Sequence, residues 1–198
     1  EQEASGEMLP GYAVLYEKNP DVFGWISVED TPLSYPVMHT PEDPEYYLRR
    51  AFDKSDATAG TPFLDGDCFA QCGNYLIYGH NMTDGTMFGT LLSYAQESFW
   101  REHPVITLET RYEVEEYEVL AAFYARVYRK DEADAFRYYQ YTDLTDPGVF
   151  ADYLSQVQEA ALYDTGVEAS FGDALLTLST CSYHEKNGRF VVVGRKIT

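Results

Sequence analysis

Short apolar or alternating segments, separated by turn residues, recur along most of the sequence and constrain its fold more than any other feature. They are rich in β-branched and aromatic residues, which fit the pleated, half-buried surface of a sheet. The 198 residues include 18 tyrosines and 11 phenylalanines, so the chain is well supplied with such side chains. We expect strands at residues 23–28, 33–38, 61–64, 74–79, 105–109, 115–128, 174–180 and 189–197.

Helical patterns stand singly before or between these strands, and we expect helices over residues 12–18, 88–99 and 147–163. The first should stop before Asn19-Pro20, because a residue that precedes proline disfavours the helical conformation. The last begins at Asp146-Pro147, an N-cap residue followed by a proline suited to the first turn. Helices inserted singly, without a βαβ rhythm, favour a mainly β fold, either a closed barrel or a mixed sheet, over a doubly wound one.

Nothing in the sequence divides the chain, since it contains no repeat, no low-complexity tract and no long linker. We therefore expect one domain, in which residues 1–22 form an N-terminal arm and residues 23–198 form the sheet. Glu1 is not a natural initiator, so we expect the natural protein to be processed or to carry an earlier segment, such as a targeting signal or an anchor.

The formal net charge of −19 limits the partners of this chain. Affinity for nucleic acid, like affinity for an anionic lipid surface, depends on lysines and arginines that neutralise phosphates. We therefore expect neither of these partners, whereas a basic or amine-bearing partner is compatible, although solubility alone also explains such a charge. The sequence has no apolar run of about 18 residues that could span a bilayer.

Cys68, Cys72 and Cys181 are the only cysteines, an odd number and too few for a disulfide framework. Cys68 and Cys72 lie in the turn-rich stretch DGDCFAQCGN and are either bridged or two reduced thiols. A metal site needs more ligands than this spacing supplies, because no second cysteine pair or nearby histidine accompanies it. We expect no metal and no cofactor.

Cys181 lies where an apolar, strand-like segment, LLTLST, gives way to the turn-like segment SYHEKNG. A side chain at the end of a strand is held by the scaffold and still reaches solvent, which suits a nucleophile; a buried free cysteine would only be a small hydrophobe. A thiol nucleophile needs a base. His80, in YGHNM, also follows a predicted strand and is the best placed, with His184 as a second candidate. The other two, His39 and His103, resemble ordinary loop residues.

Arg189 opens the last predicted strand. If residues 174–180 and 190–197 form an antiparallel hairpin, its turn returns Arg189 to the side of Cys181. Arginine does not release its proton in proteins, but it donates fixed hydrogen bonds that stabilise an oxyanion or hold a carbonyl. The alternative is an ordinary surface arginine in a hairpin.

Three motifs, YGHNM, TLSTCSY and RFVVVG, together resemble the sortase family, whose active site combines a strand-borne histidine, a TxTC-type cysteine and a downstream arginine. NPDVFGWI, YPVMHT, YYLRRAF and TPFLD further resemble class B sortases, as does the expected helix before the cysteine strand. The resemblance covers about residues 12–197. It implies an eight-stranded sortase-type β-barrel with an N-terminal helical cap.

The resemblance also implies a function, that of a cysteine transpeptidase. Such an enzyme cleaves a C-terminal sorting motif of NPxTx or LPxTG type at the threonine carbonyl, through a thioester. It then transfers the secreted protein to an amine of a cell-wall peptide or a pilin. The implied location is the extracellular face of the cell membrane, with an N-terminal anchor outside this chain. The residues implied in catalysis are His80, Cys181 and Arg189, and those implied in lining the peptide groove are Tyr78, Ser179 and Thr180.

Other interpretations stay open. A cysteine hydrolase would share the acyl-enzyme chemistry and release the acyl group to water, and a surface binding module would keep the barrel without activity. Tyr78 is equally well explained as a core residue of its strand. Ser182 stands where some relatives have an acidic residue, and the resemblance assigns no role to Cys68 and Cys72.

Overall fold

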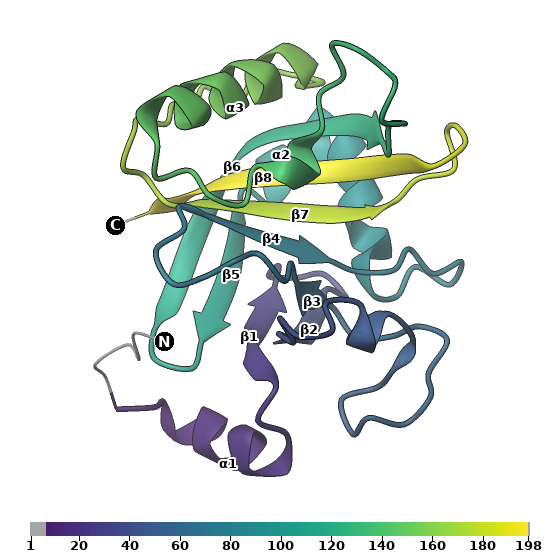
Figure 1. The fold of residues 1–198 in the computed structure, drawn as a ribbon, viewed down its shortest axis with the longest axis vertical. Helices are drawn as coiled ribbons and strands as arrows, with labels where there is room; N and C mark the ends of the chain where they lie inside the picture. Colours follow the sequence, from purple (N-terminus) through teal and green to yellow (C-terminus); the bar gives the residue numbers. More distant parts are fainter. Residues whose placement is uncertain (1–6, 198) are drawn as a thin grey trace.

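Eight strands close into one barrel in the computed structural model, which describes residues 7–197 (Figure 1). They are β1 (Val22–Ser27), β2 (Ser34–Met38), β3 (Phe63–Leu64), β4 (Asn74–Tyr78), β5 (Val105–Thr110), β6 (Val114–Arg126), β7 (Leu175–Cys181) and β8 (Gly188–Ile197). Around the barrel their order is β1-β2-β3-β4-β7-β8-β6-β5. The predicted mainly β fold is confirmed, and of the two architectures left open it is the closed barrel that forms.

The pairing directions bring three strand ends together at one rim of the barrel. β4 and β7 are parallel, with Asn74 opposite Leu175 and Tyr78 opposite Ser179, so their carboxyl ends leave the barrel side by side. β7 and β8 form an antiparallel hairpin, so the amino end of β8 returns to the same place. We call this place the catalytic rim, because the residues predicted for catalysis lie at or just beyond these three strand ends.

β7 and β8 are buried over most of their length, which explains their almost continuous apolar sequences. Leu176, Leu178 and Val192 have 0% of their surface exposed. The helix α3 (Pro147–Ala160) lies over β6 (Figure 1), and its residue Phe150 joins the same apolar cluster. Side chains at the ends of β7 and β8 therefore project from a rigid, well-packed support.

The remaining helices are short and lie outside the barrel wall. They are α1 (Pro10–Lys18), α2 (Glu97–Glu102) and the 3₁₀ helices η1 (Tyr46–Arg49), η2 (Phe88–Ala95) and η3 (Tyr138–Gln140). α1 is anchored by the buried Tyr12, whose hydroxyl donates to the carbonyl oxygen of Glu109 at 3.1 Å. Within residues 7–197 no helix combines the length and the apolar character needed to cross a bilayer.

Two predicted helices differ from the observed ones. The single helix expected over residues 88–99 is wrong, because Gln96 is extended (φ −100°, ψ 121°) and separates η2 from α2. The helix expected to reach residue 163 ends at Ala160. Just beyond it, Leu162 donates its backbone N–H to a carbonyl oxygen of β6 at 2.9 Å. The chain leaves the helix to bond the sheet, a tertiary contact that the local sequence does not reveal.

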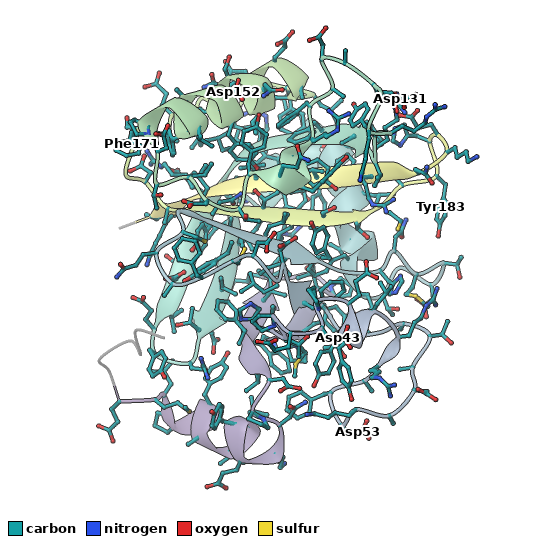
Figure 2. The ribbon with its side chains drawn as sticks, in the orientation of Figure 1. Asp43, Asp53, Asp131, Asp152, Phe171 and Tyr183 are labelled. Carbon is teal, nitrogen blue, oxygen red and sulfur yellow. The ribbon has the colours of Figure 1, made fainter. Side chains whose placement is uncertain are left out.

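Acidic side chains are spread over the outer surface. Asp43, Asp53, Asp131 and Asp152, labelled in Figure 2, are exposed and stand on different parts of the molecule. Much of the net charge of −19 is thus carried by solvated groups, which favours a role in solubility over one localised binding face.

Candidate active site

His80 and Cys181 are neighbours at the catalytic rim, because they continue two paired parallel strands. Beyond the last register pair, Gly79 donates its backbone N–H to the carbonyl oxygen of Ser179 at 3.1 Å. The hydroxyl of Thr180 in turn donates to the carbonyl oxygen of Gly79 at 2.7 Å. His80 and Cys181 follow immediately, on chains that adjacent pairing holds about 4.8 Å apart.

Arg189 is the register partner of Cys181 in the hairpin of β7 and β8. The turn is closed by the backbone N–H of Ser182, which donates to the carbonyl oxygen of Gly188 at 3.0 Å. A Cβ atom on Gly188 would lie 2.4 Å from the carbonyl oxygen of Ser182, so this close approach requires glycine. Nη1 of Arg189 donates to the carbonyl oxygens of Gly188 at 2.9 Å and Asn187 at 3.3 Å. These bonds hold one nitrogen of the guanidinium, while Nε and Nη2 have no hydrogen-bond partner among residues 7–197.

A backbone carbonyl orients the imidazole of His80. Its Nε2 atom lies 2.7 Å from the carbonyl oxygen of Leu48, which belongs to η1. A carbonyl oxygen only accepts hydrogen bonds, so Nε2 carries the proton of this bond. Nδ1 is therefore the ring nitrogen that can gain and lose a proton during a reaction.

The three residues line a cleft of about 320 Å³. Its lining also includes Leu48, Phe63, Asp65, Val127, Tyr138 and Tyr139. A cleft of this volume, apolar with a few polar groups, is typical of a ligand-binding site. Cys181 is only partly buried, whereas Cys68 and Cys72 are both buried. Of the three thiols, that of Cys181 is the one placed to meet a ligand.

The residues predicted to bind substrate also line this cleft, but their hydroxyls already have partners inside the protein. The hydroxyl of Ser179 lies 2.7 Å from that of Tyr138, and both are buried. The hydroxyl of Thr180 donates to the carbonyl oxygen of Gly79, which follows β4. Tyr78 donates its hydroxyl to Oδ2 of Asp65 at 2.9 Å, and burial together with this carboxylate raises the pKa of the phenol. These side chains shape the cleft wall, and the surface they offer a ligand is largely apolar.

The structure also distinguishes His80 from the other candidate histidines by their positions. His184, the second candidate, is held within the β7–β8 turn: its Nδ1 lies 2.9 Å from Oγ of Ser182 and its Nε2 lies 3.2 Å from Glu185. His103 contacts the carbonyl oxygen of Glu29 at 3.1 Å, away from the cleft lining. Of the histidines in the described chain, His80 alone lines the cleft.

A family model for the sortase domain matches residues 26–197. The chain belongs to the sortase family. Sortase B of Listeria monocytogenes is 33% identical to it, over 98% of this chain and 77% of that relative. The crystal structure of Staphylococcus aureus sortase B has a TM-score of 0.85 and 28% identity, and covers 97% of this chain and 89% of its own. A Staphylococcus aureus sortase B–substrate complex gives a TM-score of 0.82 at 26% identity, over 97% and 87% of the two chains.

These similarities place the chain among the class B sortases, which are cysteine transpeptidases that recognise sorting motifs. Sortases act at the surface of Gram-positive cells. The predicted family and type of enzyme are therefore confirmed.

The site of this sortase includes three groups that the sequence analysis missed. The carbonyl oxygen of Leu48 has no sequence signature, because every residue has one. Tyr138 is one of 18 tyrosines, and nothing in its neighbourhood marks it as part of a cleft. Asn81 was within reach of prediction, since it follows His80 in YGHNM; its side-chain amide donates to the carbonyl oxygen of Cys181 at 3.1 Å. This bond ties the two rim segments together directly.

Burial and a nearby cation act in opposite directions on Tyr138. Burial raises the pKa of this phenol to about 12, while the hydrogen bond with Ser179 and the positive charge of Arg189 lower it. At neutral pH the phenol is therefore protonated and acts as a neutral hydrogen-bonding group beside Arg189.

Proposed function

We propose that this sortase uses Cys181 as its nucleophile, His80 as its proton carrier and Arg189 as its oxyanion donor. The observation that carries the proposal is that three groups from distant parts of the chain meet at one rim. Cys181 ends β7, the parallel neighbour of the strand that leads to His80, and it pairs with Arg189 across the β7–β8 hairpin. All three line the same cleft.

The proposed substrate is a secreted protein with a sorting motif of NPxTx or LPxTG type. The Cys181 thiolate attacks the carbonyl carbon of the motif's threonine, and a carbon–sulfur bond forms. The carbonyl oxygen becomes an oxyanion, which the free donors of Arg189 stabilise. The carbon–nitrogen bond then breaks, and His80 gives its Nδ1 proton to the leaving amine. The product is a thioester on Cys181.

The second half of the reaction reverses these roles. An amine of a cell-wall peptide, or of a pilin lysine, attacks the thioester carbon and forms a new amide bond. His80 takes the proton that this amine loses, and the thiolate of Cys181 leaves. Microscopic reversibility makes one imidazole sufficient for both halves, provided that it stays oriented. The bond from Nε2 to Leu48 supplies that orientation.

The cleft walls support an extended peptide as the ligand. Under the proposal Tyr78, Ser179 and Thr180 contribute wall surface beside the threonine of the motif, with their hydroxyls held inside the protein. We further propose that residues 1–22 serve as an arm and cap for the catalytic barrel of residues 23–198, and that an anchor preceding them holds the enzyme on the extracellular face of the membrane.

Incubation of the purified protein with fluorogenic NPxTx and LPxTG peptides tests the proposal. Triglycine, or a peptide with a lysine side-chain amine, is added as the acceptor, and products are identified by mass spectrometry. We expect a ligated product with one of these amines. Cleavage that yields only hydrolysed peptide at saturating amine would favour a cysteine hydrolase. Binding without any cleavage would favour an inactive binding module.

A further inference from the structure

The loop that joins β3 to β4 carries the two cysteines that the reaction does not use. We call residues 65–73 the cysteine loop. Two successive turns shape it, since Cys68 donates its backbone N–H to Asp65 O and Cys72 donates to Phe69 O, each at 3.1 Å. Phe69 is 49% exposed, whereas Cys68 and Cys72 are 3% and 0% exposed. Both cysteine side chains thus turn inward from an exposed loop.

The two sulfur atoms occupy one small polar site. The carbonyl oxygen of Asn74 accepts from Sγ of Cys72 at 3.2 Å and from Sγ of Cys68 at 3.5 Å. Sγ of Cys68 also accepts the backbone N–H of Leu76 at 3.5 Å. The neighbouring Cys68 thiol stabilises the ionised form of Cys72 and holds the pKa of Cys72 below its ordinary value, although burial acts in the opposite direction. One member of the pair is thereby activated as a nucleophile, with the other beside it.

Neither peptide transfer nor metal binding accounts for this pair. Asn74 pairs with Leu175 at the start of the β4–β7 ladder, and Cys181 lies six residues further along β7. At about 3.3 Å per residue the two ends are roughly 20 Å apart, too far for the pair to exchange with Cys181 within one molecule. Among residues 7–197 no three His, Cys, Asp or Glu side chains form a group that could hold a metal ion.

We propose that Cys68 and Cys72 form a modification site, a dithiol that is reversibly oxidised to an intramolecular disulfide closing the cysteine loop. The oxidant is an external disulfide, RSSR. The Cys72 thiolate attacks one of its sulfurs, which releases RS⁻ and leaves a mixed disulfide on Cys72. Cys68 loses its proton and attacks the Cys72 sulfur, which releases the second RS⁻. The two released RS⁻ ions take up the protons that Cys68 and Cys72 have lost. The two cysteine thiols are thus oxidised, and RSSR is reduced to two RSH.

The cellular location of the family suits this chemistry. Sortases act at the cell surface, where disulfides form and persist. The buried position of both sulfurs means that the cysteine loop must open locally before exchange, so we expect slow oxidation and slow reduction.

The bridge would stabilise a junction between several parts of the fold. The carbonyl oxygen of Cys72 accepts the backbone N–H of Leu144 at 2.7 Å, and Gly73 forms an isolated bridge with Asp143. The cysteine loop therefore joins the β3–β4 hairpin to the segment before α3. The disulfide should therefore raise thermal stability, and both of its sulfurs lie near the end of β4 opposite to His80.

Peptide mapping of the unaltered chain tests the site. The protein is reduced with dithiothreitol, incubated with oxidised glutathione, alkylated and digested with trypsin. Cys68 and Cys72 fall on one tryptic peptide, residues 55–101, and Cys181 falls on another, residues 138–186. We expect peptide 55–101 to lose about 2 Da, the mass of two hydrogens, and to carry no alkyl group. Two alkyl groups on it, or a persistent glutathione adduct, would overturn the proposal.

Thermal unfolding gives a second readout that does not depend on peptide transfer. In a Cys181→Ala background, which removes the third thiol, oxidation should raise the Tm by about 3 to 8 °C. The added Cys68→Ser or Cys72→Ser change should abolish this rise. A rise of the same size in the serine variants, or none in their parent, counts against the disulfide. Neither experiment uses a sorting peptide, so failure of the proposed transpeptidase mechanism would leave both results interpretable.

Discussion

The Nε2 atom of His80 lies 2.7 Å from the carbonyl oxygen of Leu48, 32 residues earlier in the chain. Leu48 belongs to η1, a single 3₁₀ turn on the connection between β2 and β3. The proton carrier of the proposed reaction is thus oriented by a backbone atom, where many enzymes use a carboxylate. A carbonyl oxygen carries no charge to change with pH, and it accepts from the neutral and the protonated imidazole alike.

The first prediction concerns the tautomer of His80. In its neutral form the imidazole should carry its proton on Nε2, because the carbonyl oxygen of Leu48 cannot donate. Long-range ¹⁵N–¹H correlation spectra of the protein with labelled histidine distinguish the two tautomers. His184 serves as the reference, since its two ring nitrogens contact a hydroxyl and a carboxylate. A neutral His80 with its proton on Nδ1 would contradict the orientation described here.

The second prediction moves the carbonyl oxygen of Leu48 by a change at Gly60, which does not itself line the cleft. Gly60 has φ +60°, and a Cβ atom on it would lie 2.5 Å from that oxygen. We expect Gly60→Ala to displace the oxygen and to lower kcat/KM by about 10- to 100-fold, because small misplacements of catalytic groups are costly.

The control for this change is Gly166→Ala. Gly166 has a similar left-handed conformation, with φ +71°, but a Cβ atom there meets nothing within 4 Å. Backbone strain should lower the unfolding free energy of both variants by about 1 kcal/mol. Gly60→Ala should lose more, because its Cβ atom also lies 2.7 Å from the carbonyl oxygen of Tyr47, and only Gly60→Ala should lose kcat/KM. Equal kcat/KM values for the two variants would show that the position of the Leu48 carbonyl oxygen does not matter.

The third prediction separates the charge of Arg189 from its geometry. Arg189→Lys keeps the positive charge but removes the planar set of donors, so we expect kcat/KM to fall by about 10²- to 10³-fold. The matched control is Arg195→Lys, on the same strand, where the arginine bonds Glu118 and the carbonyl oxygen of Glu168 instead. Peptide cleavage is measured for both. Near-normal turnover in Arg189→Lys would remove the oxyanion role and leave only an electrostatic one.

The strand-borne part of this site could be predicted from the sequence, because local patterns determine it. The segments LLTLST and RFVVVG are predicted to be strands. The turn between them is short enough to form a hairpin, which returns Arg189 to the side of Cys181. That His80 lies near Cys181 was harder to predict, because it depends on the parallel pairing of β4 and β7 across 101 residues. The order of the motifs, through the resemblance to a family, indicated this proximity, whereas hydrophobic periodicity does not show which strands pair.

Other parts could not be predicted, for physical reasons. The oxygen of Leu48 that orients His80 is a backbone atom, so no side chain marks it in the sequence. The helix η1 has neither an apolar periodicity nor a capping side chain by which it could be predicted. The early end of α3 at Ala160 follows a tertiary contact, the bond from Leu162 to β6, which overrides local helical preference. The bonds of Gln96 are local, and among residues 7–197 the structure gives no tertiary partner for the break there.

The fourth prediction tests Tyr138 as a support for the cleft wall. Tyr138→Phe removes the hydroxyl that lies 2.7 Å from Oγ of Ser179 and leaves a buried polar atom without this partner. We expect the free energy of unfolding, measured in urea, to fall by about 1 to 2 kcal/mol. Tyr183→Phe, at a position 78% exposed, should change it by less than about 0.5 kcal/mol. Equal stabilities of the two variants would mean that the hydroxyl pair contributes nothing.

The fifth prediction follows from buried phenols and concerns alkaline pH. Burial raises the pKa of Tyr138 and of Tyr163 from 10.0 to about 12. In the unfolded chain these phenols lose their protons near pH 10.0, while in the folded chain they keep them. The folded state therefore binds more protons between about pH 10 and pH 12, and by linkage the free energy of unfolding falls as pH rises through this window. Below about pH 10 this contribution is fully present.

Urea unfolding from about pH 9 to pH 12 measures the fall, and phenolate absorbance of the native protein follows the delayed ionisation. If all tyrosines ionised near pH 10.0 in the native protein without loss of stability, the burial of these hydroxyls would be disproved.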